Sequence, residues 1–346
     1  MFENIIDKEL VRQAKTLVDS ADRIFLCGHV SPDGDATGST LAFYDYLLSA
    51  GKQVTVAYPN SYPDFLANLP HASEALFYDK DPEKIDEAIA SADLICLLDF
   101  NAVSRLEAMG DSILKSSARR LMIDHHLNPS AECDVTLSYP EMSSTCELLF
   151  YVLYYWGAFE HMSLACATDI YCGIMTDTGC FSYNCNRPEV FYVIGQLMSR
   201  GIDRDEIYNE VFRNYSLWRY RLLGYVLYAK MEVLKGANAA YYTLDRLEQK
   251  KFHYIKGDTE GLVNMPLSIK GIRLSASFRE DTEKDAIRVS LRSTGDFPCN
   301  KMAEEFFNGG GHKNASGGEL HCSIEEAVDI YKKAVEKYHS LLVTKK

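Results

Sequence analysis

The stretch RIFLCGHVSPDGDATGS, residues 23–39, places a histidine and two aspartates directly after an apolar run. The run RIFLC is typical of a buried β-strand, and a helical pattern follows the polar residues. His29, Asp33 and Asp35 lie between the two, in a turn that contains a proline and a glycine. Carboxylates this close together repel one another unless positive charge lies between them. The stretch therefore predicts a strand and a helix with a polar site at the carboxyl end of the strand.

The same alternation of apolar runs and helical patterns continues through the first half of the chain. Further β-rich runs occupy residues 53–58, 75–78, 94–100 and 120–126. Helical patterns occupy residues 37–51, 82–92, 104–117, 145–157, 163–177 and 188–201. This order predicts an α/β fold: β/α units forming a mainly parallel sheet with helices on both faces.

The pattern changes near residue 230. Residues 204–230 are helical and charged, whereas AAYYTL, IRLSASFRE and AIRVSLRST alternate like strands. A short helix, a glycine cluster and a closing amphipathic helix follow these strands. We therefore expect an α/β domain over 1–203, a helical linker over 204–230 and a smaller α+β domain over 231–346.

Composition excludes several classes of protein. The chain has 346 residues, of which 47% are hydrophobic and 25% charged, as in globular proteins. A net charge of −13 argues against a track for long duplex nucleic acid, although a small anionic ligand stays possible. The longest apolar stretch, residues 148–159, is too short to cross a bilayer, and the first residues do not resemble a signal peptide. Ten scattered cysteines without a CxxC pair favour reduced thiols and a cytoplasmic location.

Acidic and imidazole side chains recur where the predicted strands end. Asp99 ends one run, and Asp124, His125 and His126 end the next. Because the carboxyl ends of parallel strands meet at one edge of a sheet, we expect these groups to gather beside the first histidine. Asp177, which closes a helical pattern, is a further candidate.

Each of these residues also has an ordinary structural explanation. His29 could be a solvated residue at a strand end, and SPDGD is a common turn sequence. Asp99 could cap a helix, and Asp177 could lie in a surface turn. A shared site explains all of the coincidences together, and we prefer it for that reason.

Four aspartates at one edge would be balanced by two divalent cations. Oxygen-rich ligation with some imidazole and no thiolate suits Mn²⁺ or Mg²⁺ better than structural Zn²⁺. One carboxylate that bridges two ions would give the spacing of hydrolytic two-metal sites. We expect two divalent cations, with Mn²⁺ preferred and Mg²⁺ possible.

At this point the chain resembles a known family. HVSPDGDATGS, LLDF, IDHH and MTDTG, in this order, resemble the four motifs of the DHH phosphoesterase superfamily. NGGGHKNASGG resembles the glycine-histidine motif of the DHHA1 substrate-binding domain. The resemblance spans nearly the whole chain, and its length and architecture are similar to those of the bifunctional oligoribonuclease and 3′-phosphoadenosine-5′-phosphate (pAp) phosphatase (NrnA-like) subfamily.

The resemblance implies a role for each matching position. It implies that His29 and Asp33 hold the first cation, that Asp35, His125 and Asp177 hold the second, and that Asp99 bridges them. His126 would contact the scissile phosphate or donate a proton to it, and Asp124 would orient an imidazole. The implied substrate contacts are Arg292, Ser293, Gly309, Gly310, Gly311 and His312. A flexible hinge for the glycines and a solvated position for the arginine stay open as alternatives.

The resemblance implies a metal-dependent phosphohydrolase. Its substrates would be short oligoribonucleotides, linear dinucleotides such as pApA and pGpG, and pAp, with no membrane partner. An exopolyphosphatase or pyrophosphatase is one alternative, and a non-catalytic nucleotide sensor is another. Two positions differ from many relatives, Cys180 in place of arginine and Ser316 in place of alanine. Substrate ranking, cleavage polarity and a homodimer stay open.

Overall fold

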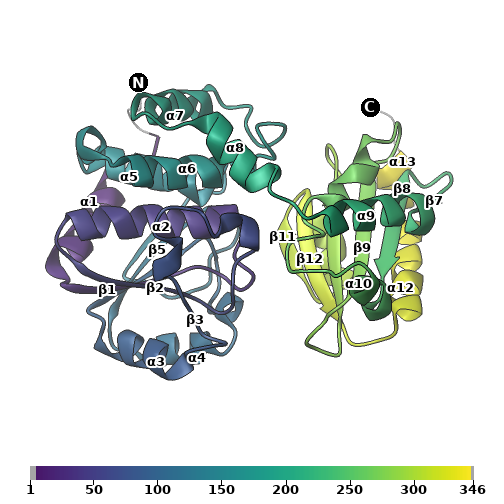
Figure 1. The fold of residues 1–346 in the computed structure, drawn as a ribbon, viewed down its shortest axis with the longest axis horizontal. Helices are drawn as coiled ribbons and strands as arrows, with labels where there is room; N and C mark the ends of the chain where they lie inside the picture. The colour runs from purple at the N-terminus through teal and green to yellow at the C-terminus, as the bar shows by residue number, and fades with distance from the viewer. Residues whose placement is uncertain (1–4, 344–346) are drawn as a thin grey trace. The chain divides into compact units, whose positions relative to one another are not determined.

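The chain folds into two compact units. The computed structural model describes residues 5–343, and the units meet in sequence between Asn214 and Tyr215 (Figure 1). The segment expected as a linker is helical, and the boundary falls within it. Helix α8 (Arg204–Phe212) belongs to the first unit, whereas α9 (Leu217–Tyr225) and the π-helical turn η5 (Val226–Lys230) belong to the second.

The first unit contains a six-stranded parallel sheet. In spatial order its strands are β3 (Leu76–Phe77), β2 (Gln53–Tyr58), β1 (Arg23–Cys27), β4 (Leu94–Leu98), β5 (Arg119–Asp124) and β6 (Val135–Ser138). Because every pairing is parallel, all of the strands end at the same edge. The α/β fold class predicted from the sequence is confirmed.

Helices cover both faces of this sheet (Figure 1). They are α1 (Lys8–Ser20), α2 (Gly34–Ser49), α3 (Pro82–Ser91), α4 (Met109–Lys115), α5 (Thr145–Tyr155), α6 (Leu164–Asp177), α7 (Pro188–Ser199) and α8. Alternate residues of the strands enter two separate cores. On β4, for example, Cys96 packs with α1, α2, α5 and α6, whereas Ile95 and Leu97 pack with α3 and α4. Burial on both faces explains why this strand is apolar throughout.

Two local features differ from the expectation. Helix α2 begins at Gly34, three residues before the predicted start, so that Asp33 caps the helix and Asp35 lies in its first turn. The strand β6 was missed, because its sequence VTLS is short and polar at alternate positions. The earlier start of α2 brings both aspartates to the sheet edge.

The second unit is a mixed α+β domain. In spatial order its strands are β11 (Gly310–His312), β12 (Ala315–Leu320), β10 (Ile287–Ser293), β9 (Leu274–Glu280), β8 (Ala239–Leu244) and β7 (Glu232–Leu234). Only the β8–β9 pair is parallel. The glycine cluster of the sequence thus contains a strand of its own, β11.

Each face of this second sheet has a different cover. One face packs against α11 (Cys299–Phe306) and α12 (Ile324–Lys337), which α13 (His339–Val343) follows. On the other face, residues of β8 pack with α9 and the 3₁₀ helix η6 (Leu262–Ser268), near the short helix α10 (Arg246–Lys251). A buried phenol on β8, Tyr242, lies in this second core.

Two further observations concern the length of the helices and the state of the cysteines. Over residues 5–343, no helix is both long enough and apolar enough to cross a bilayer. All ten cysteines have free thiols, and seven of them are buried.

Candidate metal centre

Six predicted ligands gather at the carboxyl edge of the parallel sheet. His29, Asp99 and His125 follow the ends of β1, β4 and β5, whereas Asp33, Asp35 and Asp177 belong to the ends of α2 and α6. Two groups of three have ligand atoms that all lie within 4.8 Å of one another: His29, Asp33 and Asp99, and Asp35, His125 and Asp177. The structure therefore brings together side chains that are up to 148 positions apart in the sequence.

The start of α2 sets the position of Asp33. Its Oδ1 accepts hydrogen bonds from the backbone N–H groups of Asp35, at 3.0 Å, and Ala36, at 3.1 Å. Its Oδ2 lies 3.9 Å from His29 Nε2. Between them in sequence, Gly34 allows the close approach of α6, because a Cβ there would lie only 2.3 Å from Thr176 Oγ1.

Asp99 lies between two imidazoles. Its Oδ2 is 3.5 Å from His29 Nε2, and its Oδ1 is 3.6 Å from His125 Nε2. The Thr145 hydroxyl donates a 2.9 Å hydrogen bond to that same Oδ1. The Asp99 backbone is left-handed, with φ of 65°, a conformation that costs about 1–3 kcal/mol for a residue other than glycine. The fold therefore maintains a strained backbone in order to hold this carboxylate between the two groups of ligands.

The start of α5 holds the second group. The backbone N–H groups of Thr145 and Cys146 donate to the two oxygens of Asp35, at 2.6 and 2.9 Å. His125 Nε2 lies 3.7 Å from Asp35 Oδ2 and 3.4 Å from Asp177 Oδ2. The positive end of a helix dipole thus stabilises a buried carboxylate beside the neighbouring imidazole.

The remaining two residues of the IDHH motif form a pair next to this centre. His126 Nδ1 is 2.7 Å from Asp124 Oδ1 and 3.7 Å from Asp99 Oδ1. Asp124 is fully buried, and no hydrogen bond reaches its Oδ2 among the described residues. A buried carboxylate with one oxygen on an imidazole nitrogen fixes the orientation and tautomer of that ring.

In the absence of cations, the electrostatic interactions among the carboxylates of this site are unfavourable. Burial, together with the neighbouring carboxylates of Asp35 and Asp33, raises the pKa of Asp99 well above its ordinary value. Burial lowers the pKa of His29 to about 4. Burial would also lower the pKa of His125, but the charges of Asp177 and Asp35 outweigh it and raise this pKa. Bound cations would relieve this repulsion between carboxylates.

The donor set fits divalent cations. Ligand atoms of an octahedral or trigonal ion at ~2.1 Å lie about 3 to 3.6 Å apart, close to the 3.4–3.9 Å separations between imidazole nitrogens and carboxylate oxygens. Only oxygen and imidazole nitrogen atoms point into these two groups, and no thiolate joins them among residues 5–343. Hard oxygen donors with imidazole are the ligands that Mn²⁺ accepts.

The helix α5 was predicted over 145–157, but its contacts with the predicted ligands are the part of the site that sequence reasoning missed. Thr145 and Cys146 hold two of the six predicted ligands through hydrogen bonds. The sequence does carry a helix start, since Ser144 caps α5 by accepting from the Glu147 N–H at 2.9 Å. The motif SSTCE therefore predicts the helix terminus. Nothing in it predicts that the terminus faces Asp35.

Two of the predicted substrate contacts in the second unit, Arg292 and His312, lie on one face of its sheet. His312 pairs with Ala315, which pairs with Arg292, and directly opposed residues of antiparallel strands share a face. The neighbouring row consists of small residues, Gly310, Gly317, Ser290 and Ser277. This half-buried face therefore carries the Arg292 guanidinium and the His312 imidazole next to a row of small residues.

Other predicted contacts have structural roles. Ser293 is buried, and its hydroxyl donates to the Phe297 carbonyl at 2.8 Å while accepting from Asn314 Nδ2 at 2.8 Å. A Cβ on Gly309 would lie 1.8 Å from the Gly317 oxygen, and Gly311 has φ of 134°. The first and third glycines of NGGGH are thus needed for β11 to pair with β12. Gly310 alone has open space at its Cβ position.

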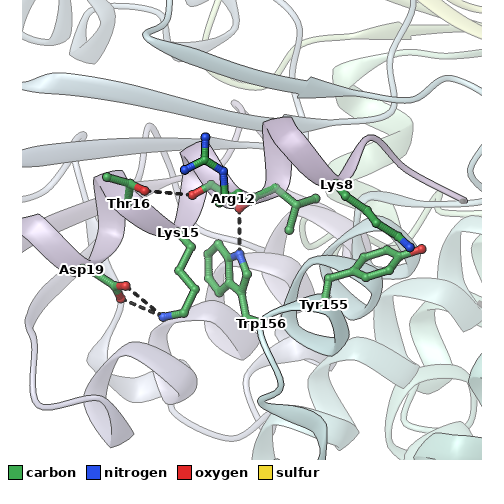
Figure 2. A pocket seen from close by; sticks show the side chains of 8 residues that line it. Lys8, Arg12, Lys15, Thr16, Asp19, Tyr155 and Trp156 are labelled. Atoms are coloured by element: carbon green, nitrogen blue, oxygen red, sulfur yellow. Dashed lines mark hydrogen bonds and ion pairs between the residues drawn. The ribbon is translucent and has the colours of Figure 1, made fainter. Parts of the chain in front are cut away.

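A separate pocket of about 330 Å³ lies on the first unit (Figure 2). Lys8, Arg12 and Lys15 of α1 line it, opposite Tyr155 and Trp156 at the end of α5. The lysines lie 5.8 Å from the two ring centroids, and Lys15 pairs with a neighbouring aspartate. None of the predicted site residues lines this pocket.

Comparison with known proteins assigns both parts of the chain to known domain families. Residues 23–174 match the N-terminal domain of the DHH family, and residues 236–338 match the DHHA1 domain. A bifunctional oligoribonuclease and PAP phosphatase NrnA from Bacillus subtilis is 29% identical over 309 residues, covering 88% of this chain and 91% of the relative. The Thermus thermophilus protein of that name is 27% identical over 317 residues, with 91% and 89% coverage.

Solved structures give the same fold. The crystal structure of an exopolyphosphatase-related protein from Bacteroides fragilis is 49% identical, with a TM-score of 0.93, and covers 99% of this chain and 100% of that one. A structure of RecJ from Thermus thermophilus in complex with Mn²⁺ is 14% identical, with a TM-score of 0.55, and covers 97% of this chain and 55% of that one. At this identity, the similarity to RecJ shows a shared fold and nothing more.

Proposed function

The chain belongs to the DHH family of phosphoesterases and carries a DHHA1 domain, and on this premise we propose that it hydrolyses small phosphorylated nucleotides. The proposed substrates are short oligoribonucleotides, pApA, pGpG and pAp. The position of Asp99, with one oxygen towards each of two groups of ligands, is the main support. Relatives named as oligoribonuclease and PAP phosphatase support the substrate class.

Two divalent cations, preferably Mn²⁺, complete the proposal. His29 and Asp33 would hold the first, Asp35, His125 and Asp177 would hold the second, and Asp99 would hold both. Such a pair would acidify a water molecule for attack on phosphorus and neutralise charge on the phosphoryl oxygens. The buried, mutually repelling carboxylates support this assignment.

The protein's own groups position the proton and the substrate. Asp124, which accepts from His126 Nδ1, would keep the ring in the tautomer whose Nε2 contacts the phosphate or the leaving oxygen. Arg292 and His312 would bind a second phosphate or a base on the half-buried face of the second sheet that they share. The predicted substrate contacts of Ser293, Gly310 and Gly311 stay predictions.

A panel of substrates tests this proposal. Purified protein is incubated with Mn²⁺ or Mg²⁺ and with a five-residue oligoribonucleotide, pApA, pGpG, pAp or polyphosphate. We expect release of mononucleotide or phosphate from the nucleotides with Mn²⁺, and none after chelation. Full turnover after complete removal of metal would refute the two-cation assignment.

One relative favours a second candidate. The 49% identical relative is named exopolyphosphatase-related, and the same centre would serve for polyphosphate without any contact to a base. A polyphosphate preference in the panel, with little turnover of pApA, would select this candidate. Tight binding of pApA without any product would instead indicate a sensor.

We also propose a cytoplasmic location. Ten free thiols, most of them buried, are typical of a reducing compartment. Non-reducing and reducing mass measurements of the protein purified under thiol-blocking conditions test the state of the cysteines, and native disulfides would contradict this location.

A further inference from the structure

The loops at the carboxyl edge of the first sheet contain very few cations. They comprise residues 28–33, 59–63, 78–81, 99–108, 125–134, 139–144 and 178–187, whose lysines and arginines are Lys80, Arg105 and Arg187. The Lys80 ammonium lies 4.8 Å from the centroid of the Phe77 ring. Arg187 is already engaged, since Nη1 lies 3.3 Å from Glu147 Oε1 and donates to the Glu141 carbonyl at 2.9 Å. The exposed guanidinium of Arg105 has no hydrogen bond or ion pair with any described residue.

The backbone connects Arg105 to the metal centre through one residue. The Val30 N–H donates to the Arg105 carbonyl at 2.8 Å, and the Val30 carbonyl lies 2.8 Å from His29 Nδ1. Arg105 is thus two hydrogen bonds from a predicted ligand.

The loop that carries Arg105 is anchored at its other end. Asn101 Nδ2 donates to the Leu127 carbonyl at 2.6 Å, and the Ser130 N–H donates to the Asn101 carbonyl at 2.7 Å. The strained backbone of Asp99 lies immediately before this loop. The base of the arginine side chain is therefore held in place, while its charged end has no partner among residues 5–343.

We propose that the Arg105 guanidinium binds a non-bridging oxygen of the phosphate that is hydrolysed, on the His29 side of the centre. This inference rests on the proposed function and adds a catalytic residue to it. Phosphate oxygens are the natural partners of a guanidinium, which reaches two of them with paired N–H groups. Negative charge grows on these oxygens in the transition state, so that the contact stabilises the transition state more than the substrate.

The test compares Arg105→Ala and Arg105→Lys with the matched control Lys84→Ala. Lys84 is an exposed cation on α3. We expect Arg105→Ala to lower kcat with pAp or pApA by about 10²–10³-fold. Arg105→Lys should retain part of this rate, because lysine keeps the positive charge but cannot make the paired hydrogen bonds of a guanidinium. Added guanidinium at a non-denaturing concentration restores part of the activity of Arg105→Ala only.

Two readouts do not depend on turnover. Calorimetric titration of the Mn²⁺-loaded protein with inorganic phosphate should show about 10- to 100-fold weaker binding in Arg105→Ala, and Lys84→Ala should bind as the wild type does. The affinity for Mn²⁺ itself should be unchanged in all variants. Unchanged phosphate binding, absence of guanidinium rescue, or loss of Mn²⁺ affinity in Arg105→Ala would each overturn the assignment.

The two hypotheses fail in different ways. A wild-type protein that hydrolyses none of the nucleotides, yet binds phosphate with dependence on Arg105, refutes the proposed substrates and keeps this inference. A protein that hydrolyses pAp equally well with and without Arg105 refutes the inference and keeps the proposed function.

Discussion

The backbone N–H of Thr145 donates a 2.6 Å hydrogen bond to Oδ2 of Asp35, across 110 positions of sequence. The Thr145 hydroxyl also donates to Asp99 at 2.9 Å. One residue at the start of α5 thus orients two carboxylates that face the same imidazole, His125. The geometry of the site therefore depends on these donors as well as on the proposed ligands.

Removal of the Thr145 hydroxyl should weaken metal binding without unfolding the protein. In Thr145→Val the backbone bond to Asp35 remains, whereas the hydroxyl bond to Asp99 is lost. Groups that orient metal ligands typically contribute about 10–100-fold to metal affinity, and we expect a loss of that size for Mn²⁺ by calorimetry. Thr145→Ser, which keeps the hydroxyl, should bind Mn²⁺ as the wild type does. Equal affinity in all three proteins would show that the hydroxyl bond is unimportant.

Asp99→Asn should abolish hydrolysis and stabilise the metal-free protein. The Asp99 carboxylate is buried among other carboxylates, so its neutral isostere removes repulsion, and asparagine tolerates the left-handed backbone. Thermal unfolding with and without Mn²⁺ measures both effects. We expect a higher Tm than that of the wild type without metal and a smaller rise on addition of Mn²⁺. Near-normal turnover in this variant would refute the bridging role.

The Asp124–His126 pair should act on rate and leave metal binding intact. Replacement of a general acid or base costs about 10²–10⁴-fold in rate, and we expect His126→Ala to lower kcat within this range. Asp124→Asn should cause a smaller loss, because the imidazole remains and only its orientation is disturbed. Mn²⁺ titration provides the control. A His126→Ala protein with normal kcat and weaker Mn²⁺ binding would identify His126 as a ligand instead.

His312→Ala should mainly raise KM. The imidazole lies on a half-buried face of the second sheet in the same cross-strand row as Arg292, where a role in binding is proposed. We expect Arg292→Lys to raise KM as well, because lysine cannot make the paired hydrogen bonds of a guanidinium. Steady-state kinetics with pApA separate the two parameters, and Lys332→Ala on α12 serves as a control. A fall in kcat with KM unchanged would contradict this role.

Acid should destabilise the second unit partly through Asp281. Burial alone would raise the pKa of this carboxyl, but hydrogen bonds from the Glu283 and Lys284 N–H groups and from Arg288 outweigh burial and lower it to about 2. Since the folded-state pKa lies below the ordinary 3.8, the stabilisation is present above about pH 4 and is lost as the pH falls towards 2.

Urea unfolding between pH 5 and pH 2 tests this dependence. Asp281→Asn should be less stable than the wild type at pH 5, and the difference should shrink as the pH falls. The exposed Asp329→Asn on α12 serves as the control. A constant difference between Asp281→Asn and the wild type across the range would show that this carboxyl does not titrate as described.

The clustering of most of the proposed ligands was predictable, because these residues lie at strand ends. His29, Asp99 and His125 each follow an apolar run, and parallel strands bring such positions to one edge. The strand β11 was not predictable from the pattern, because glycine is rare in strands and common in turns. Close approach to β12 explains the glycines on either side of Gly310, since a Cβ on Gly309 would lie 1.8 Å from the Gly317 oxygen and one on Gly311 would lie 2.7 Å from the Ala315 oxygen.

By itself the sequence determined the α/β architecture, the edge at which the site lies and the identity of the charged groups, because these depend on local periodicity and on the order of elements along the chain. The tertiary structure alone decided which oxygen of Asp99 faces which histidine, that α5 supplies donors to Asp35, and that the Arg105 guanidinium pairs with none of the residues that the structure describes. Those features depend on distances between segments that are far apart in sequence, and such distances are set by the packing of helices on the sheet.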